Sequence, residues 1–509
     1  MKQGTLLAAI DLGSNSFRLE IGRYEHGQIQ RIEYLKETVR QGRGFDENRN
    51  LSQESMVRGW ECLARFAERI AGFHKSQVRA VATQTLREAK NREAFIKRGY
   101  EILGFPIEVI SGSEEARLIY QGVSQLLPTD HKRRLVIDIG GRSTELVLGQ
   151  NLQAHVTGSF RVGSVAWSMK YFPDGALTEQ AFSKAEIAAK AVLEEALEKY
   201  PRSQWDTAYG SSGTVGAVAD VLQAEGWPAG EVTMEGFNWL IKQLVRAGHV
   251  DYVRLEGLRE DRRAVIGGGA SVLRALMQLL DIEKLDVAQG ALRQGVLFEM
   301  VERDDHATDV RDISIQRLAQ KFTIDQTQSQ RVSRVALQLF SKAIANSEFD
   351  NPLVQKLKRK LSWAAAMHEV GFAISHTDYH KHGAYILENA DLLGFSMQEL
   401  QRLGLLVLGH RGKLRKLEAD FEEVEFVKML IALRLAVILC HARKNPDQTG
   451  LEFSCNDKSK TFTLEADADW LDSYPQSVHL LRQEVIAWQK TPWAFAFTQA
   501  ARVNNRLNF

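Results

Sequence analysis

The sequence predicts an α/β fold made of two related halves, followed by a mainly helical part. Strand-like and helix-like segments alternate over about the first 300 residues, which is typical of α/β proteins. Residues 10–22 recur as residues 137–149, a spacing of 127, which indicates a duplicated unit. After about residue 303 helical periodicity dominates.

Length and composition limit the possible classes of protein. The chain has 509 residues, of which 44% are hydrophobic and 25% charged. Such a chain is expected to form three or four domains of ~100–200 residues each, and its composition excludes a mainly disordered, collagen-like or coiled-coil protein. The 65 Lys and Arg balance 64 Asp and Glu, for a net charge of +1. A nucleic-acid or membrane binder driven by global charge is therefore not expected, while a local basic patch stays open.

Cysteine usage and the apolar runs indicate the compartment. The three cysteines, Cys62, Cys440 and Cys455, include no CxxC pair, which argues against a disulfide framework or a thiolate zinc site. The apolar runs 6–10 and 429–440 are too short for a signal-peptide core and a membrane span, respectively. We therefore expect a cytoplasmic protein.

The apolar patterns predict individual elements and four domains. Two strand–turn–strand units are expected at 6–10 with 17–23 and at 134–138 with 144–148; further strands at 78–82, 107–110 and 460–465; and helices at 52–73, 113–127, 331–342, 353–367, 397–408 and 426–442. Polar runs near 302–310 and 444–449 indicate boundaries. The predicted domains are residues 1–127, 128–303, 304–445 and 446–509.

The repeat aligns without a gap, and six of its thirteen positions are identical. Unrelated hairpins also use Asp and Gly in their turns, but six coincidences in one register favour duplication. Small residues in the turns let backbone N–H groups approach an anion. The candidate phosphate-binding residues in the two turns are Gly13, Ser14, Asn15, Ser16, Gly140, Gly141, Ser143 and Thr144.

An aspartate precedes each turn, and the duplication would place Asp11 and Asp138 across a cleft. Two carboxylates beside a phosphate site suit Mg²⁺, held largely through retained waters. In the alternative, each aspartate only satisfies its own turn. The duplicated pair favours the metal.

Two more glycine-rich segments, 210–214 and 267–271, precede apolar helical runs. A helix that begins behind such a loop offers an anion site, although Gly and Ser are also ordinary helix-start residues. Ser212, Gly213 and Thr214 are the candidate phosphate ligands of the first segment.

Two glutamates, Glu114 and Glu115, begin the helix expected at 113–127. Acidic residues in a first turn stabilise a helix by ~0.3–1 kcal/mol, and a carboxylate facing a cleft would also suit a general base. Periodicity does not choose between these roles, nor between the two residues.

Several segments together resemble a known family. Residues 9–18, 82–87, 110–117, 137–145 and 210–214 resemble, in order, the motifs of the exopolyphosphatase / guanosine pentaphosphate phosphohydrolase family. Residues 364–371, 380–387 and 410–411 resemble the C-terminal part of the long bacterial exopolyphosphatases, which is similar to HD-type phosphohydrolase domains. The resemblance implies a duplicated actin-like (Hsp70-like ATPase) two-lobed core, a helical HD-like domain and a small C-terminal α+β domain.

The resemblance also implies roles for single residues. Glu115, which directly precedes Ala in the family's Glu-Ala-Arg segment, would orient or deprotonate the attacking water, and Arg87 would bind a further phosphate. Mg²⁺ would be positioned by Asp11 and Asp138, with Glu145 as a further candidate ligand. Arg142 stands where the family usually has a third glycine. It would either clash with a close phosphate or add a cation to it, and we favour the cation.

Histidines and basic residues mark the helical region. Gln328, Glu369 and Val437 stand where an HD site would need His, Asp and Asp, so no active second metal centre is expected. Residues 356–416 hold ten Lys and Arg against five acids. This run is either a solvated face or a track for a polyanion. The candidate track residues are Lys358, Arg359, His380, His382, Arg411 and Lys413.

The sequence therefore predicts an exopolyphosphatase that releases terminal phosphate from inorganic polyphosphate with Mg²⁺, and the resemblance implies a homodimer. The near alternative is a guanosine pentaphosphate 5′-phosphohydrolase of the same family. More distant alternatives are a non-catalytic actin-like nucleotide-binding protein, since fold does not fix function, and a signalling protein whose helical domain binds a partner.

Overall fold

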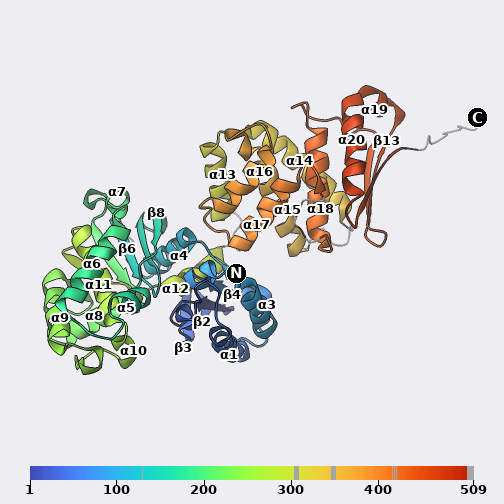
Figure 1. The fold of residues 1–509 in the computed structure, drawn as a ribbon. Helices are drawn as coiled ribbons and strands as arrows, with labels where there is room; N and C mark the ends of the chain where they lie inside the picture. Colours follow the sequence, from blue (N-terminus) through green and yellow to red (C-terminus); the bar gives the residue numbers. More distant parts are fainter. Residues whose placement is uncertain are drawn as a thin grey trace, which may run out of the picture. The chain divides into compact units, whose positions relative to one another are not determined.

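The computed structural model describes residues 1–128, 130–302, 309–344, 351–414, 417, 419 and 421–500 (Figure 1). The chain forms two compact units, Met1–Asp309 and Val310–Phe509. The first unit combines two sheets with helices, and the second is mainly helical. No helix in the described ranges is long and apolar enough to cross a membrane.

Two sheets of the same topology form the first unit. The first has the order β3-β2-β1-β4-β5 and the second the order β10-β11-β9-β6-β7-β8. In each sheet the first three strands along the chain, β1–β3 or β6–β8, are antiparallel. The next strands, β4 and β5 or β9 and β11, are parallel to the first of them, and β10 adds an antiparallel edge to the second sheet. The strands are β1 (Leu6–Leu12), β2 (Phe17–Glu25), β3 (Gln28–Glu37), β4 (Val78–Ala82), β5 (Ile107–Val109), β6 (Arg133–Ile139), β7 (Thr144–Gln150), β8 (Gln153–Phe160), β9 (Thr207–Ser211), β10 (Glu231–Thr233) and β11 (Lys284–Val287).

The strand register confirms the predicted duplication. Asp11 lies opposite Arg18 in the first hairpin, and Asp138 lies opposite Glu145 in the second. These pairs occupy equivalent positions of the ungapped sequence repeat. In both sheets the first hairpin strand also pairs in parallel with the strand that carries the next loop, β4 or β9.

Two helices form a layer shared by the sheets: α4 (Gly112–Ser124) packs against β7 and β8, and α12 (Leu292–Glu302) against β1 and α4 (Figure 1). One core cluster joins side chains of both sheets to these helices. The helices cross closely, because a Cβ on Gly122 or Gly295 would overlap the backbone of the opposite helix. The predicted second lobe, residues 128–303, thus ends in a helix that also packs on the first sheet.

The remaining helices cover the sheets. Those beside the first sheet, with which they form the first lobe, are α1 (Gln53–Arg69), α2 (Gln84–Glu88) and α3 (Arg92–Leu103). Those beside the second sheet, with which they form the second lobe, are α5 (Ser164–Tyr171), α6 (Glu179–Leu193), α7 (Ala196–Lys199), α8 (Ser212–Ala224), α9 (Met234–Ala247), α10 (Glu260–Arg263) and α11 (Ile266–Leu279).

The second unit has one continuous core, which includes residues of the helices and of a three-stranded sheet. Most of the central helix α18 is buried, and its Arg434 pairs with Glu484 of α20. The elements are α13 (Val310–Lys321), α14 (Gln326–Ala343), α15 (Pro352–Met367), α16 (Tyr379–Asn389), α17 (Met397–Gly409), α18 (Val424–Leu439), β12 (Leu451–Asn456), β13 (Thr461–Ala466), α19 (Ala468–Ser473), α20 (Pro475–Trp488) and β14 (Ala494–Gln499). The helical and α+β parts, which the sequence predicts as separate domains at 304–445 and 446–509, therefore share one core within a single compact unit.

The shared helix layer leads to a test by truncation. A chain ending at Asp309 should fold, because it keeps α12, whereas one ending at Gly290 should not. Without α12 the core loses Leu292, Val296 and Leu297, each of which contributes ~1.5–3 kcal/mol of burial. Circular dichroism and thermal melting would check this, and cooperative melting of the shorter chain would contradict it.

Candidate active site

The two repeated turns lie against each other. A Cβ built on Gly141 would lie 3.4 Å from the Cβ of Ser14. Gly13 and Gly140 hold the same place in their turns, because a Cβ there would lie 3.0 Å from the carbonyl oxygen of Ser16 and 3.1 Å from that of Ser143, respectively. The duplicated glycines therefore keep both turns tight, and the turns meet where the lobes meet.

Several predicted phosphate-binding side chains also support the turns themselves. The Ser14 hydroxyl accepts a hydrogen bond from Thr85 Oγ1 (2.7 Å), Thr144 Oγ1 donates to the carbonyl of Val162 (2.6 Å), and Asn15 Nδ2 lies 3.5 Å from Ser16 Oγ. The hydroxyls of Ser14 and Thr144 thus fix the geometry of the loops.

The third turn, at the start of α8, lies beside the second because Ser211 of β9 pairs with Asp138 of β6. Ser212 has a φ of 86°, a backbone conformation that a non-glycine residue adopts at an energetic cost. Its hydroxyl accepts from the N–H of Thr214 (3.3 Å), and Thr214 Oγ1 donates to the carbonyl of Ile139 (3.3 Å). Gly213 leaves room for Arg262, since a Cβ there would force the Arg262 guanidinium to move.

The fourth predicted turn, 267–271, is not available to an anion. Its residues lie inside α11 and are buried, and the N–H of Gly268 donates to Ser168 Oγ (3.1 Å). A Cβ on Gly268 would overlap the backbone of Ser164 and Ser168 in α5. The glycines allow close helix packing, so the expected anion site at 267–271 is wrong.

The structure separates the two glutamates at the start of α4. Glu114 is fully buried and accepts two hydrogen bonds of 2.8 Å from Arg117, which also pairs with Glu299 of α12. Glu115 instead meets Arg87, both Nη atoms of which lie 3.2 Å from its Oε2. Glu114 therefore serves the packing of α4, and Glu115 belongs to the group of charges at the turns.

The duplicated turns differ in charge at one equivalent position. In the first turn Asp11 pairs with Arg18 (3.0 Å), and Arg293 of α12 lies 3.6 Å away. In the second turn the position of Arg18 is taken by Glu145, directly across the strand pair from Asp138. The first turn thus neutralises its aspartate, whereas the second holds two carboxylates side by side.

These buried carboxylates raise one another's pKa values. Burial raises the pKa of Glu115 to about 7, with contributions from Asp11 and Asp138, while Arg87 opposes the shift. Burial also raises the pKa of Glu145 well above its ordinary value, and Glu115 and Asp138 add to this. Burial raises the pKa of Asp138 too, against a hydrogen bond from Ser211. Full ionisation of the group therefore calls for a nearby cation.

This donor set fits Mg²⁺ bound mainly through water and substrate. Within the described ranges no three His, Cys, Asp or Glu side chains converge enough to enclose a metal. Mg²⁺ commonly uses one or two carboxylates and completes its shell with waters and phosphate oxygens. Asp138 and Glu145 supply two hard ligands, and neither forms an ion pair with an arginine within the described residues, although the charges of Arg18 and Arg293 act on Asp138. Asp11 instead pairs directly with Arg18.

A second basic group, which the sequence analysis missed, lies near Asp11. Arg262 is 9% exposed, and its Nε has no hydrogen-bond partner among the described residues. Burial lowers the pKa of Arg262, and the charge of Arg18 adds to this while Asp261 opposes it. Tyr34 is close enough to act on both arginines. Arg293 lies over the Tyr34 ring (5.0 Å). In the sequence, the only sign of this basic group is that the repeat has an arginine, Arg18, where its second copy has Glu145.

Arg142, predicted to add a cation to the phosphate site, has other partners in the structure. Its Nη1 donates to the carbonyl of Gly42 (2.9 Å), its Nη2 lies 3.4 Å from Glu88, and its guanidinium packs over the ring of Phe45 (4.9 Å). All three partners belong to the first lobe. Arg142 neither clashes with the turn nor stands free, but ties the second turn to the first lobe.

The HD-like region uses its polar side chains within the second unit. His368 Nδ1 lies 2.7 Å from the carbonyl of Ala365, and Glu369 pairs with Arg443 (2.7 Å). Gln328 donates to the carbonyl of Cys440 (3.0 Å). The carboxylate that stands in place of the HD aspartate is thus held by an arginine.

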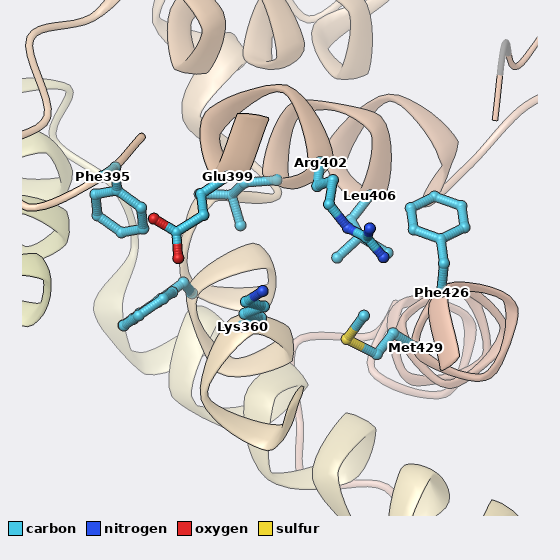
Figure 2. Close-up of a pocket in the computed structure, with 9 residues that line it drawn as sticks. Lys360, Phe395, Glu399, Arg402, Leu406, Phe426 and Met429 are labelled. Atoms are coloured by element: carbon cyan, nitrogen blue, oxygen red, sulfur yellow. The ribbon is translucent and has the colours of Figure 1, made fainter. Parts of the chain in front are cut away.

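The predicted basic track falls into two groups in the second unit. Lys358 and Arg359 lie on α15, where Arg359 pairs with Asp312 and packs near Trp363 (5.5 Å). Lys360 follows and lines a narrow pocket with Glu399 and Arg402 (Figure 2). The other group comprises His380, His382, Arg411 and Lys413, and there Arg411 packs over the Tyr379 ring (4.7 Å). Arg415 and Lys416 lie outside the described residues.

Comparison with known proteins establishes the family. Residues 21–304 match the model of the Ppx/GppA phosphatase family, and residues 310–485 match Ppx/GppA phosphatase domain III. The chain belongs to the Ppx/GppA phosphatase family. It is therefore an enzyme that hydrolyses phosphoric anhydride bonds, built on a core of two related sheets.

Relatives match over nearly the full length. A guanosine-5′-triphosphate,3′-diphosphate pyrophosphatase of Pseudoalteromonas translucida is 38% identical over 96% of this chain and 98% of its own. A protein of the same name from Aeromonas hydrophila is 34% identical over 98% and 100%. The crystal structure of the Aquifex aeolicus Ppx/GppA family member is 26% identical, with a TM-score of 0.51 over 59% of this chain and 99% of that chain.

The neighbouring glutamates should respond oppositely to substitution. Glu114→Gln should lower the melting temperature, because weakening a buried ion pair costs up to ~3–5 kcal/mol. Glu115→Gln should be as stable as wild type at pH 4.5 and progressively more stable as pH rises to about 7. The raised pKa of Glu115, from 4.5 to about 7, means that wild type loses stability over that window.

Thermal melts from pH 4.5 to 8 with a metal chelator would measure both effects. Equal destabilisation by the two substitutions at every pH would contradict the separate roles of Glu114 and Glu115.

Proposed function

We propose that the protein hydrolyses guanosine pentaphosphate, releasing the terminal phosphate of the 5′-triphosphate. This replaces the exopolyphosphatase predicted from the sequence by its near alternative. Relatives that match 96% or more of the chain are named guanosine-5′-triphosphate,3′-diphosphate pyrophosphatases, which supports the nucleotide. Inorganic polyphosphate is the substrate with which guanosine pentaphosphate is compared in the test below.

The observation that carries this proposal is the presence of two separate cationic groups. Arg87 stands beside Glu115, whereas Arg262 and Arg18 lie beyond Asp11 with Tyr34. A nucleoside that carries phosphates on both its 5′ and 3′ sides could engage both groups, and the Tyr34 ring is already packed against Arg31 (5.7 Å) and Arg293 (5.0 Å). A linear polyphosphate has no nucleoside to hold two sets of phosphates apart.

Glu115 is suited to act as the general base. Its pKa of about 7 gives a carboxylate more basic than usual that is still ionised in a useful fraction near neutral pH. The water loses a proton to Glu115 as its oxygen bonds to the terminal phosphorus. The anhydride bond to the bridging oxygen breaks, so orthophosphate and the shortened nucleotide leave. Arg87 holds Glu115 and faces the phosphoryl charge, and the two turns keep the phosphate in line.

We propose Mg²⁺ as the cofactor, held by Asp138 and Glu145. When bound, the ion supplies charge neutralisation for the phosphoryl oxygens. The second lobe would thus bind the ion through this pair of carboxylates in its turn. On the side of the first turn, Asp11 is held by Arg18 and Arg293. These two arginines would also bind anionic groups of the substrate.

The test of the proposed function is phosphate release from guanosine pentaphosphate and from long and short polyphosphates at equal enzyme concentration. We expect the nucleotide to have the highest kcat/KM, and Glu115→Gln to lower its kcat by ~10²–10⁴-fold with little change in nucleotide binding. A clear preference for polyphosphate would restore the function first predicted. Tight nucleotide binding without any hydrolysis would favour the non-catalytic alternative.

The asymmetry of the turns predicts different metal responses. Asp138→Asn should raise the Mg²⁺ concentration for half-maximal activity, because an amide binds a hard cation less well than a carboxylate. Asp11→Asn should change this concentration less, since Asp11 is neutralised by Arg18. Mg²⁺ titrations of kcat would measure both, and an unchanged titration in Asp138→Asn would exclude Asp138 as a ligand.

A further inference from the structure

Glu88, the last residue of α2, receives two cations from the opposite lobe. Its Oε2 lies 3.4 Å from Arg142 Nη2, and its Oε1 lies 3.6 Å from Arg161 Nε. Its side chain is only 11% exposed and that of Arg142 is 24% exposed, so this pair is less screened than a surface pair, whereas Arg161 is largely exposed and adds less. Arg142 also donates to the carbonyl of Gly42, so this side chain contacts the first lobe at both Glu88 and Gly42. Glu88 therefore lies where the second turn is tied to the first lobe.

The contact continues from Glu88 to the catalytic centre through Gln84. Gln84 Nε2 donates to Glu88 Oε1 (2.6 Å), and Gln84 Oε1 accepts from Arg87 Nη2 (2.5 Å). Both Nη atoms of Arg87 in turn face Glu115, and Nη1 also donates to the carbonyl of Ile110 (2.7 Å). A guanidinium can only donate and a carboxylate only accept, so the amide of Gln84 has a single orientation that satisfies both neighbours.

We propose that Glu88 and Gln84 are positioning residues that couple the seating of the second lobe to the placement of Arg87 at the catalytic glutamate. Arg142 and Arg161 hold Glu88, Glu88 orients the Gln84 amide, and that amide directs Arg87 towards Glu115. Arg87 is correctly aligned when the second turn is docked against the first lobe. The inference rests on the proposed function only in taking Glu115 as the base, and it does not depend on which phosphate compound is hydrolysed.

The chain offers a contrasting contact between the lobes. Lys36 Nζ of β3 lies 2.8 Å from Asp261 of α10, and within the described ranges neither residue is hydrogen-bonded or ion-paired to Arg87 or Gln84. Both contacts hold the lobes together, but only Glu88 is connected to Arg87. A general loosening of the lobes and a specific loss of Arg87 alignment can therefore be separated.

The test is a set of double-mutant cycles on kcat and KM, with full-length enzyme and guanosine pentaphosphate. Glu88→Ala should lower kcat by ~5–30-fold, which lies within the range of coupling energies seen for residues of one network. In an Arg87→Ala background, Glu88→Ala should change kcat by less than about twofold, because its effect passes through Arg87. Gln84→Ala should behave in the same way in both backgrounds.

Two further variants sharpen the test. Glu88→Gln keeps an acceptor oxygen for Gln84 and should retain more kcat than Glu88→Ala. Lys36→Ala should affect KM more than kcat, and its effect should multiply with that of Arg87→Ala. Thermal melts of every variant would exclude global unfolding as the cause.

An equal fall in kcat on Glu88→Ala in both backgrounds would overturn the proposal, because Glu88 would then act without Arg87. If wild type hydrolyses only polyphosphate, the proposed function fails and the same cycles are measured on that substrate. If wild type hydrolyses neither, hydrogen exchange of the Arg87 guanidinium is followed by NMR. Exchange should quicken in Glu88→Ala and not in Lys36→Ala, and equal exchange in both variants would overturn the proposal.

Discussion

The packing of α4 against α12 is the constraint on which the candidate site depends. α4 carries Glu115, and α12 returns from residues about 180 positions later to cover it. Glycines at the crossing let the backbones touch, and Glu299 of α12 accepts from both Arg79 and Arg117. The buried acid Glu114 is therefore neutralised by Arg117, so the adjacent Glu115 can remain directed towards the turns.

Because of the duplication the site has two similar turns, and a difference in charge at one position gives the two turns different functions. Arg18 and Glu145 occupy equivalent positions beside equivalent aspartates. One lobe becomes a cationic surface with Arg262 and Tyr34 nearby, and the other becomes an anionic surface suited to a metal ion. A phosphoryl group between them would meet fixed positive charge on one side and a bound cation on the other, which is the arrangement that phosphoryl transfer requires.

The fold was predictable from the sequence where its signals were local. The hairpins, their register and the helices at 52–73 and 353–367 follow from apolar periodicity and turn residues over short windows. Glycine-rich segments are ambiguous, because the same small residues suit an anion loop and a close helix crossing; 210–214 adjoins the site, whereas 267–271 packs on α5. Arg262 has no local signal, since its surroundings come from strands more than 200 residues away in sequence.

Arg142 shows why a departure from a family pattern is hard to interpret from sequence. A turn that usually has glycine was expected to place this arginine near phosphate. The side chain is long enough to leave the turn and bind the first lobe instead, where Gly42 has no Cβ to block it; a Cβ there would come within 2.9 Å of Arg142 Cδ. Gly42 therefore makes room for Arg142 as well as for Ser14 of the first turn, whose Cβ and carbonyl oxygen would lie 3.2 Å from such a Cβ. Through Glu88, the exchange of a small residue for a cation reaches the side chains that touch Glu115, although none of these contacts is local in the sequence of the second turn.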